Sequence, residues 1–173
     1  MTRSRTGSII LIAYTSTPAN DRVARLNRDL EGHRARLVFE GPSGYLRATL
    51  EALDVPIESQ IAVFVPDSLQ RGRIGLGNPR TIFFNESVAV AWVRGGFIEL
   101  ASQDPEQGLI FYMLDGVEVD TPRFARRNDC LTCHYSFATA GIPGTLARSS
   151  GRFVVDHRVP LDQRWGGWAA VSL

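Results

Sequence analysis

The sequence predicts an α+β fold in which two short helices precede an antiparallel β-meander and a helix-and-loop segment follows it. Apolar residues recur at helical spacing early in the chain, and the period changes to two from Thr81 onward. The apolar segments after Thr81 are separated by short polar connections, which favour antiparallel neighbours. The length of 173 residues fits a single domain with a sizeable core.

Both helices have recognisable ends. Asn20 and Asp21 can cap the first helix, which Gly32 ends. The second helix is predicted to start at Ser43 or Gly44 and to end before Pro56. The inward positions at helical spacing are Val23, Leu26 and Leu30 in the first helix and Leu46, Leu50 and Leu53 in the second.

The strands are predicted from alternating or continuous apolar runs between turn residues. The segment from Ser68 to Pro79 is rich in Gly and Arg and is predicted to be a loop. The predicted strands are Ile61–Val65, Thr81–Phe84, Ser87–Val93, Phe97–Ala101 and Leu109–Leu114.

Composition excludes several classes of protein. Apolar residues make up 44% and charged residues 21%, as in an ordinary globular domain. The net charge of +1 gives no electrostatic case for binding nucleic acid or an anionic membrane. No apolar run is long enough to span a membrane. With two cysteines, a scaffold held by several disulfides is also excluded.

The two ends of the chain carry separate expectations. Residues 1–19 are either the remnant of a secretory signal or contain a first strand over Ile9 to Ile12. The chain stops at Leu173 within an apolar run that has no turn signal. We therefore expect residues 20–173 to form one domain that is incomplete at its C-terminus.

Cys130-Leu131-Thr132-Cys133-His134 is the attachment pattern of a c-type haem. Two thiols on one helical turn can form thioethers to the two vinyl groups of one porphyrin. The histidine that follows is then placed to bind the iron. Asn128 and Asp129 can cap the short helix that this geometry needs.

Two other uses of the cysteine pair stay open. A structural zinc site needs four ligands, which Cys130, Cys133 and His157 could supply together with His134 or His33. A redox-active dithiol is the other alternative, although it usually follows a βαβ unit rather than a meander.

The chain also resembles a group of bacterial secreted proteins that contain a cytochrome c domain. The resemblance covers roughly residues 20 to 173 and implies one covalent haem c, an extracytoplasmic location and a redox role. It names no substrate and no partner. The segments that carry it are residues 78–85, 90–96, 103–105, 108–114, 122–124, 130–134, 141–144, 156–158 and 164–168.

The second axial ligand of the iron is open in the sequence. Familiar small cytochromes c have a methionine well downstream of the haem motif, and none follows His134 here. His157 is a candidate ligand, with a surface ion pair to Asp156 as the alternative. Met113 is a weaker candidate because its apolar strand suggests core packing. An iron with no sixth protein ligand is also compatible with the sequence.

Further residues are candidates for holding the cofactor. Pro143 lies in a turn whose Pro143 or Ile142 carbonyl can accept a hydrogen bond from the axial imidazole. Arg123, Arg126 and Arg127 precede the motif and suit the carboxylates of haem, a solvated basic loop being the alternative. Trp165 begins a Trp-Gly-Gly-Trp segment that can approach a porphyrin face.

The sequence therefore predicts a periplasmic or extracytoplasmic c-type cytochrome domain that transfers single electrons to a protein partner it does not identify. One alternative is a haem enzyme, or a gas or redox sensor, with five-coordinate iron. The other is a binding module stabilised by zinc held by two cysteines and two histidines.

Overall fold

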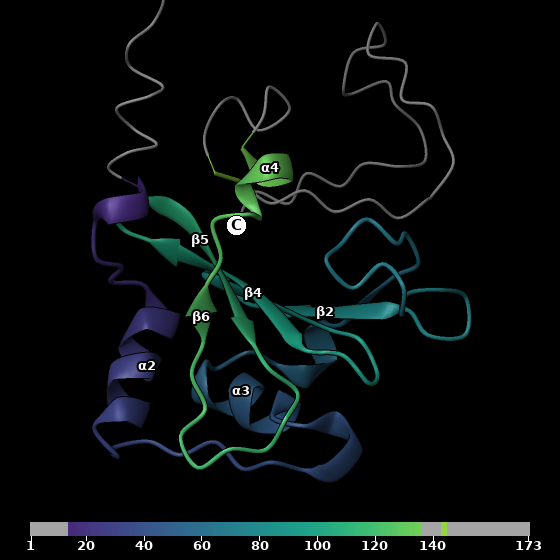
Figure 1. Cartoon of the computed structure of the whole chain (residues 1–173), viewed down its shortest axis with the longest axis horizontal. Coiled ribbons are helices and arrows are strands. Elements are labelled where there is room, and N and C mark those ends of the chain that lie inside the picture. Colours follow the sequence, from purple (N-terminus) through teal and green to yellow (C-terminus); the bar gives the residue numbers. More distant parts are fainter. Residues whose placement is uncertain (1–13, 136–142, 145–173) are drawn as a thin grey trace, which may run out of the picture.

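The computed structural model describes residues 14–135 and 143–144 and shows one antiparallel sheet of six strands. The strands lie in the sheet in the order of the chain, as the predicted meander requires. Two helices cover one face of the sheet, and a short helix lies on its other side (Figure 1). The elements are α2 (Arg22–Glu31), α3 (Leu46–Ala52), β1 (Ile61–Val63), β2 (Arg80–Phe84), β3 (Val88–Trp92), β4 (Ile98–Asp104), β5 (Gly108–Leu114), β6 (Ala125–Arg126) and α4 (Leu131–His134), with 3₁₀ turns at Gly41–Ser43 and Ile57–Ser59.

Helix α2 forms as the sequence predicts. The Asp21 carboxylate accepts hydrogen bonds from the backbone N–H groups of Val23 at 2.8 Å and Ala24 at 3.2 Å, which satisfies two donors at the helix N-terminus. Gly32 ends the helix. The three predicted inward residues of α2 are all buried.

The turns between strands use the chemistry of their residues. The Asn85 side chain accepts from the N–H groups of Ser87 and Val88, which closes the connection between β2 and β3. Gly108, which ends the connection between β4 and β5, has a φ of +76° that favours glycine. Asp104 caps the same turn by accepting from the N–H groups of Glu106 and Gln107.

The main core lies between the sheet and the helices α2 and α3. Val90, Leu100 and Tyr112 are buried there and stand side by side in the register of β3, β4 and β5. The Tyr112 hydroxyl donates to the Asp21 carboxylate at 2.5 Å, so the cap of α2 is fixed to the sheet. This face of the sheet therefore carries the main hydrophobic core of the domain.

The strand register also defines the opposite face, which we call the α4 face. Cross-strand partners share a face, so the register places two rows of side chains on this side. The rows are Phe84, Ala89, Ala101 and Phe111, and Ile82, Ala91, Glu99 and Met113. Arg80, two residues before Ile82 on the same strand, belongs to the same face.

Some boundaries differ from the prediction. Residues 43 and 44 lie outside α3, which begins at Leu46, because a 3₁₀ turn with Pro42 occupies Gly41–Ser43. Strand β1 ends at Val63 rather than Val65, while β4 continues beyond Ala101 to Asp104. Strand β6 was not predicted. Within the residues that the model describes, no helix is long and apolar enough to cross a membrane.

Candidate haem-binding site

The Cys-x-x-Cys-His motif forms one helical turn. Cys130 is the N-cap residue of α4, and its carbonyl oxygen accepts from the N–H groups of Cys133 at 3.2 Å and His134 at 3.0 Å. The two thiols therefore belong to the same turn, as attachment to one porphyrin requires. Both cysteines are free in the structure, with Cys130 partly buried and Cys133 exposed.

The prediction that Asn128 or Asp129 caps this helix is wrong. No side chain caps α4. The backbone carbonyls of Asn128 and Asp129 accept instead, from the N–H groups of Leu131 and Thr132. The Asp129 carboxylate is 2.6 Å from the guanidinium of Arg127, which competes with the helix N-terminus for the same oxygen atoms.

His134 is held at two atoms by one residue. Its Nδ1 lies 2.8 Å from the carbonyl oxygen of Gly144, and the N–H of Gly144 donates to the His134 carbonyl at 2.9 Å. A carbonyl only accepts hydrogen bonds, so Nδ1 carries the proton and Nε2 has a free lone pair. The acceptor predicted at Pro143 or Ile142 is thus the next residue, and Pro143 itself is buried beside it.

Burial favours the neutral form of the His134 ring. The imidazole packs on the ring of Phe111, with 4.7 Å between ring centroids and 40° between ring planes. Desolvation lowers the pKa of His134, against a smaller opposing effect of the hydrogen bond to Gly144. The imidazole is therefore neutral at pH 7, and neutral imidazole is the form that binds a metal.

The Cys130 sulfur lies in surroundings that disfavour a thiolate. Burial raises the pKa of Cys130 to about 11, and the carboxylates of Asp129 and Glu99 raise it further than Arg127 lowers it. A redox-active dithiol needs a thiol of lowered pKa. The environment of Cys130 therefore does not favour it as the attacking thiol of a redox-active pair.

The predicted arginines have different partners. Arg126 donates to backbone carbonyls of Tyr14 and Thr17 and to the Gln107 side chain, and its guanidinium lies over the Tyr14 ring. It therefore anchors the N-terminal segment, while its Nε is buried without a hydrogen-bond partner. Arg127 lies beside α4, where its Nη1 is 3.3 Å from the Met113 sulfur.

Arg123 is paired with an acidic residue of α2. Its Nη1 lies 3.4 Å from the Glu31 carboxylate, and both side chains are exposed. Of the three predicted basic residues, Arg127 is thus the one beside the motif. Because its guanidinium also pairs with Asp129, Arg127 holds the segment that leads into α4, and its charge is already paired.

Three residues that the sequence analysis did not single out lie on the sheet face that carries the motif. Phe111 supports the imidazole, and Arg80 and Glu99 lie on the same face of the sheet. The signal that could have identified Arg80 and Glu99 is their position. Each is charged and alternates with residues that face the main core.

Several predicted features lie outside the described residues. These are His157, Trp165, the N-terminal Ile9 to Ile12 and the C-terminal run to Leu173. His33, an optional ligand of the zinc alternative, is exposed and follows the end of α2, a helix that lies on the other side of the sheet from α4 (Figure 1). Among residues 14–135, 143 and 144, no group of three or more His, Cys, Asp or Glu side chains is arranged to hold a metal ion.

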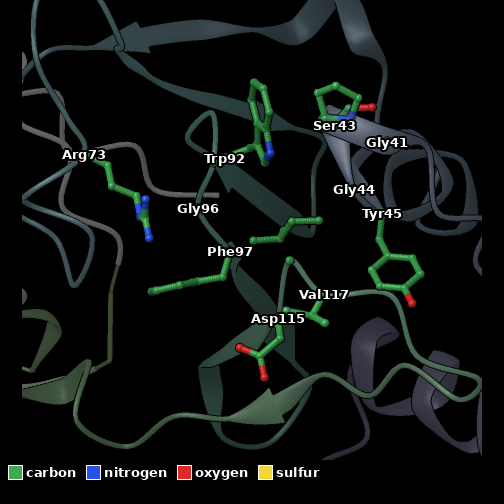
Figure 2. A pocket seen from close by; sticks show the side chains of 14 residues that line it. Gly41, Ser43, Gly44, Tyr45, Arg73, Trp92, Gly96, Phe97, Asp115 and Val117 are labelled. Carbon is green, nitrogen blue, oxygen red and sulfur yellow. The ribbon is translucent and has the colours of Figure 1, made fainter.

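A separate cavity of about 390 Å³ lies where the β3–β4 turn meets the Gly41–Ser43 turn. Figure 2 shows Trp92, Phe97 and Tyr45 around it, with Arg73 and Asp115 at its margin. It contains none of the predicted site residues. The motif and this cavity are therefore independent features of the domain.

Fold and motif together define a small α+β domain whose sheet presents a Cys-x-x-Cys-His turn with an oriented imidazole. Comparison with curated proteins finds a lipoprotein named LpqB from Mycolicibacterium smegmatis, which is 29% identical over 164 residues. The match covers 87% of this chain and 27% of that protein, so the chain spans about a quarter of its relative. No family model matches the chain, and no solved structure matches it.

Proposed function

We propose that this chain carries one haem c, attached through thioethers at Cys130 and Cys133, with His134 as an axial ligand. The domain uses it for single-electron transfer with a redox protein partner. The observation that carries the proposal is the hydrogen bond from His134 Nδ1 to the Gly144 carbonyl. It leaves Nε2 as the unprotonated nitrogen of a neutral, half-buried ring, which is the state an axial ligand needs.

The residues around the motif fit the group by their chemistry. Two free thiols lie on one turn, an imidazole with one available nitrogen follows them, and an aromatic ring supports that imidazole. When bound, haem supplies an iron that changes its oxidation state by one electron. The protein would fix the imidazole through Gly144 and Phe111, and a fixed ring keeps the ligand geometry the same in both oxidation states.

The proposed location is the periplasm or another extracytoplasmic space. The resemblance to secreted cytochrome c domain proteins implies it. The name of the Mycolicibacterium smegmatis relative, a lipoprotein, supports an envelope location for that protein and, by the proposal, for this one.

The test is to produce the protein in a host that attaches haem c. We expect a pyridine haemochrome spectrum typical of two thioether bonds, with colour that remains on the protein after acid–acetone extraction. The variant in which Cys130 and Cys133 are both alanine should lose the covalent haem. Colourless wild-type protein with stoichiometric zinc would overturn the proposal.

Two histidine variants make the test specific. Replacing His134 by alanine removes the axial nitrogen and should change the spin state of the iron. Replacing His33 by alanine is the matched control, because His33 is exposed and follows the end of α2, outside the motif. A low-spin spectrum at rest supports electron transfer, whereas a high-spin iron that binds carbon monoxide supports the enzyme or sensor alternative.

A further inference from the structure

Small side chains form the middle of the α4 face. Ala89 and Ala101 are cross-strand partners, and Ala91 lies two residues after Ala89 on the same strand. We call these three residues the alanine floor. Phe111 is the cross-strand partner of Ala101, so the ring that supports His134 lies directly beside the floor. Side chains of one carbon let a flat group approach the sheet closely.

Arg80 lies beyond the floor on strand β2. Its side chain is 13% exposed, and Nη1 is 3.7 Å from the Glu99 carboxylate. Its Nε is buried and has no hydrogen-bond partner. A buried guanidinium nitrogen without an acceptor is costly, by about 1–3 kcal/mol in general, and such a group in a native fold calls for a specific explanation.

The neighbours of Glu99 hold this charged pair in place. Gln70 donates to the Glu99 carboxylate at 3.2 Å, and the Ser68 hydroxyl donates to it at 3.4 Å. Gln70 also bonds the backbone of Phe97 on both its amide atoms, so the loop is fixed to β4. The Glu99 carboxylate therefore has several hydrogen-bond donors around it, whereas the Nε of Arg80 has no acceptor.

The pair lies on the sheet face that carries the motif. Glu99 is two residues before Ala101 on β4, and Ala101 pairs with Phe111, whose ring contacts His134. The Nε of Arg126 is likewise buried without a partner, but Arg126 pairs with Tyr112 and so lies on the opposite face, and Arg127 pairs with Asp129. Among the described residues, Arg80 is thus the cation of the α4 face with a buried N–H donor that lacks an acceptor.

We propose that Arg80 binds a carboxylate of the haem, whose ring lies against the alanine floor. The inference rests on the proposed function and adds to it the residue that recognises the charged edge of the cofactor. Haem carries two propionate groups, and arginine pairs with carboxylates through parallel N–H donors. Such a pair would supply the acceptor that the buried Nε lacks.

The test uses the full chain with Cys130 and Cys133 replaced by alanine, so that porphyrins bind without covalent attachment. Two probes are compared, ferric protoporphyrin IX and its dimethyl ester, which differ only in the two carboxylates. We expect the free acid to bind more tightly by about tenfold to a hundredfold, the range of one charge-assisted interaction. This comparison changes the ligand alone and leaves the protein unaltered.

Variants then assign the preference to a residue. In Arg80→Gln the ratio of the two dissociation constants should fall to near one, and Arg80→Lys should restore part of it. Arg127→Gln is the matched control and should keep the full preference, because Arg127 is paired with Asp129. If Arg80 had a purely structural role, its replacement would weaken the binding of both porphyrins equally and leave the ratio of their dissociation constants unchanged.

Each result has one meaning. A parent protein that binds both porphyrins equally, or an Arg80→Gln variant that keeps the preference, would overturn the role of Arg80 and leave the haem site standing. A parent protein that binds neither porphyrin and gains no covalent haem when its cysteines are present would overturn the proposed function itself.

Discussion

The ring of Phe111 on β5 supports the imidazole of His134, with 4.7 Å between their centroids. This contact joins the Cys-x-x-Cys-His motif to the most extensively paired part of the sheet, since β5 is hydrogen-bonded along its length to β4. The orientation of His134 thus depends on the sheet as well as on Gly144. The backbone adds to this link, because the Phe111 carbonyl accepts from the N–H of Arg127 at 2.8 Å.

Replacing Phe111 by alanine should therefore affect stability and the iron together. We expect a loss of about 3–5 kcal/mol in the free energy of unfolding, as for other buried phenylalanines. The haem spectrum should become heterogeneous because the imidazole loses its support. Thermal unfolding and optical spectra of the loaded protein would measure both. Phe84→Ala is the control, since Phe84 is half-buried on the same face and far from β5 in the register. An unchanged spectrum in Phe111→Ala would contradict the supporting role.

The link between α2 and the sheet can be tested at Tyr112. Its hydroxyl donates to Asp21, whose side chain is fully buried. Removing the hydroxyl in Tyr112→Phe leaves a buried carboxylate oxygen without that donor, so we expect a loss of about 1–3 kcal/mol. Denaturant unfolding is the measurement. Tyr14→Phe, which removes a hydrogen bond to the backbone carbonyl of Leu109, should cost less. Equal costs would show that the charge of Asp21 is unimportant.

Acid should weaken the domain through Asp104. Burial alone would raise the pKa of this carboxyl, but hydrogen bonds from the backbone of Asn20, Glu106 and Gln107, together with Arg126, lower it overall. A carboxyl with a lowered folded-state pKa contributes stability above its unfolded pKa of about 3.9, and this contribution is lost as pH falls through the folded pKa. The free energy of unfolding should therefore decrease below about pH 4.

The Asp104→Asn variant isolates this effect. Its amide can still accept from Glu106 and Gln107, but it presents an NH₂ group to the N–H of Asn20, which now donates to Oδ2 at 2.7 Å. We expect a loss of about 1–3 kcal/mol at pH 7 and a weaker decline in stability on acidification. Parallel pH profiles for the two proteins would contradict the assignment.

The two cysteines should react at different rates in the protein without haem. Cys133 is exposed, whereas Cys130 is partly buried and has a pKa raised to about 11. Because the thiolate is the reactive form, iodoacetamide should modify Cys133 first at pH 8. The rate of Cys130 modification should increase by about tenfold for each unit by which the pH is raised, until the pH reaches the pKa. Mass spectrometry of the single variants Cys130→Ala and Cys133→Ala gives both rates, and equal rates at pH 8 would exclude the described burial of Cys130.

The meander and the motif were predictable because their signals are local. Alternating residues define the strands from β2 to β5, and the polar connections between them fix the antiparallel order. Strand β6 could not be predicted, because Ala125 and Arg126 carry no apolar signal and pair with β5 only through tertiary contacts. Helix α3 starts later than expected because Pro42 favours a tight turn before it.

The site was harder to predict than the fold. The spacing of Cys130, Cys133 and His134 identified the motif, but the partners of His134 come from a distant strand and from a turn ten residues later. Arg126 was assigned to the cofactor from its position near the motif in the sequence. Neighbouring residues of a strand point to opposite faces, so Arg126 and Arg127 have separate roles. Sequence proximity does not carry that information.

The agreement between strand order and chain order has a consequence for how the protein matures. Every strand after β1 pairs with the strand synthesised just before it, and such local pairing forms quickly. The sixth strand ends at Arg126, four residues before the first cysteine. A chain that emerges from its N-terminus can thus pair all six described strands before either thiol appears. Any machinery that modifies these thiols would then meet an already built platform.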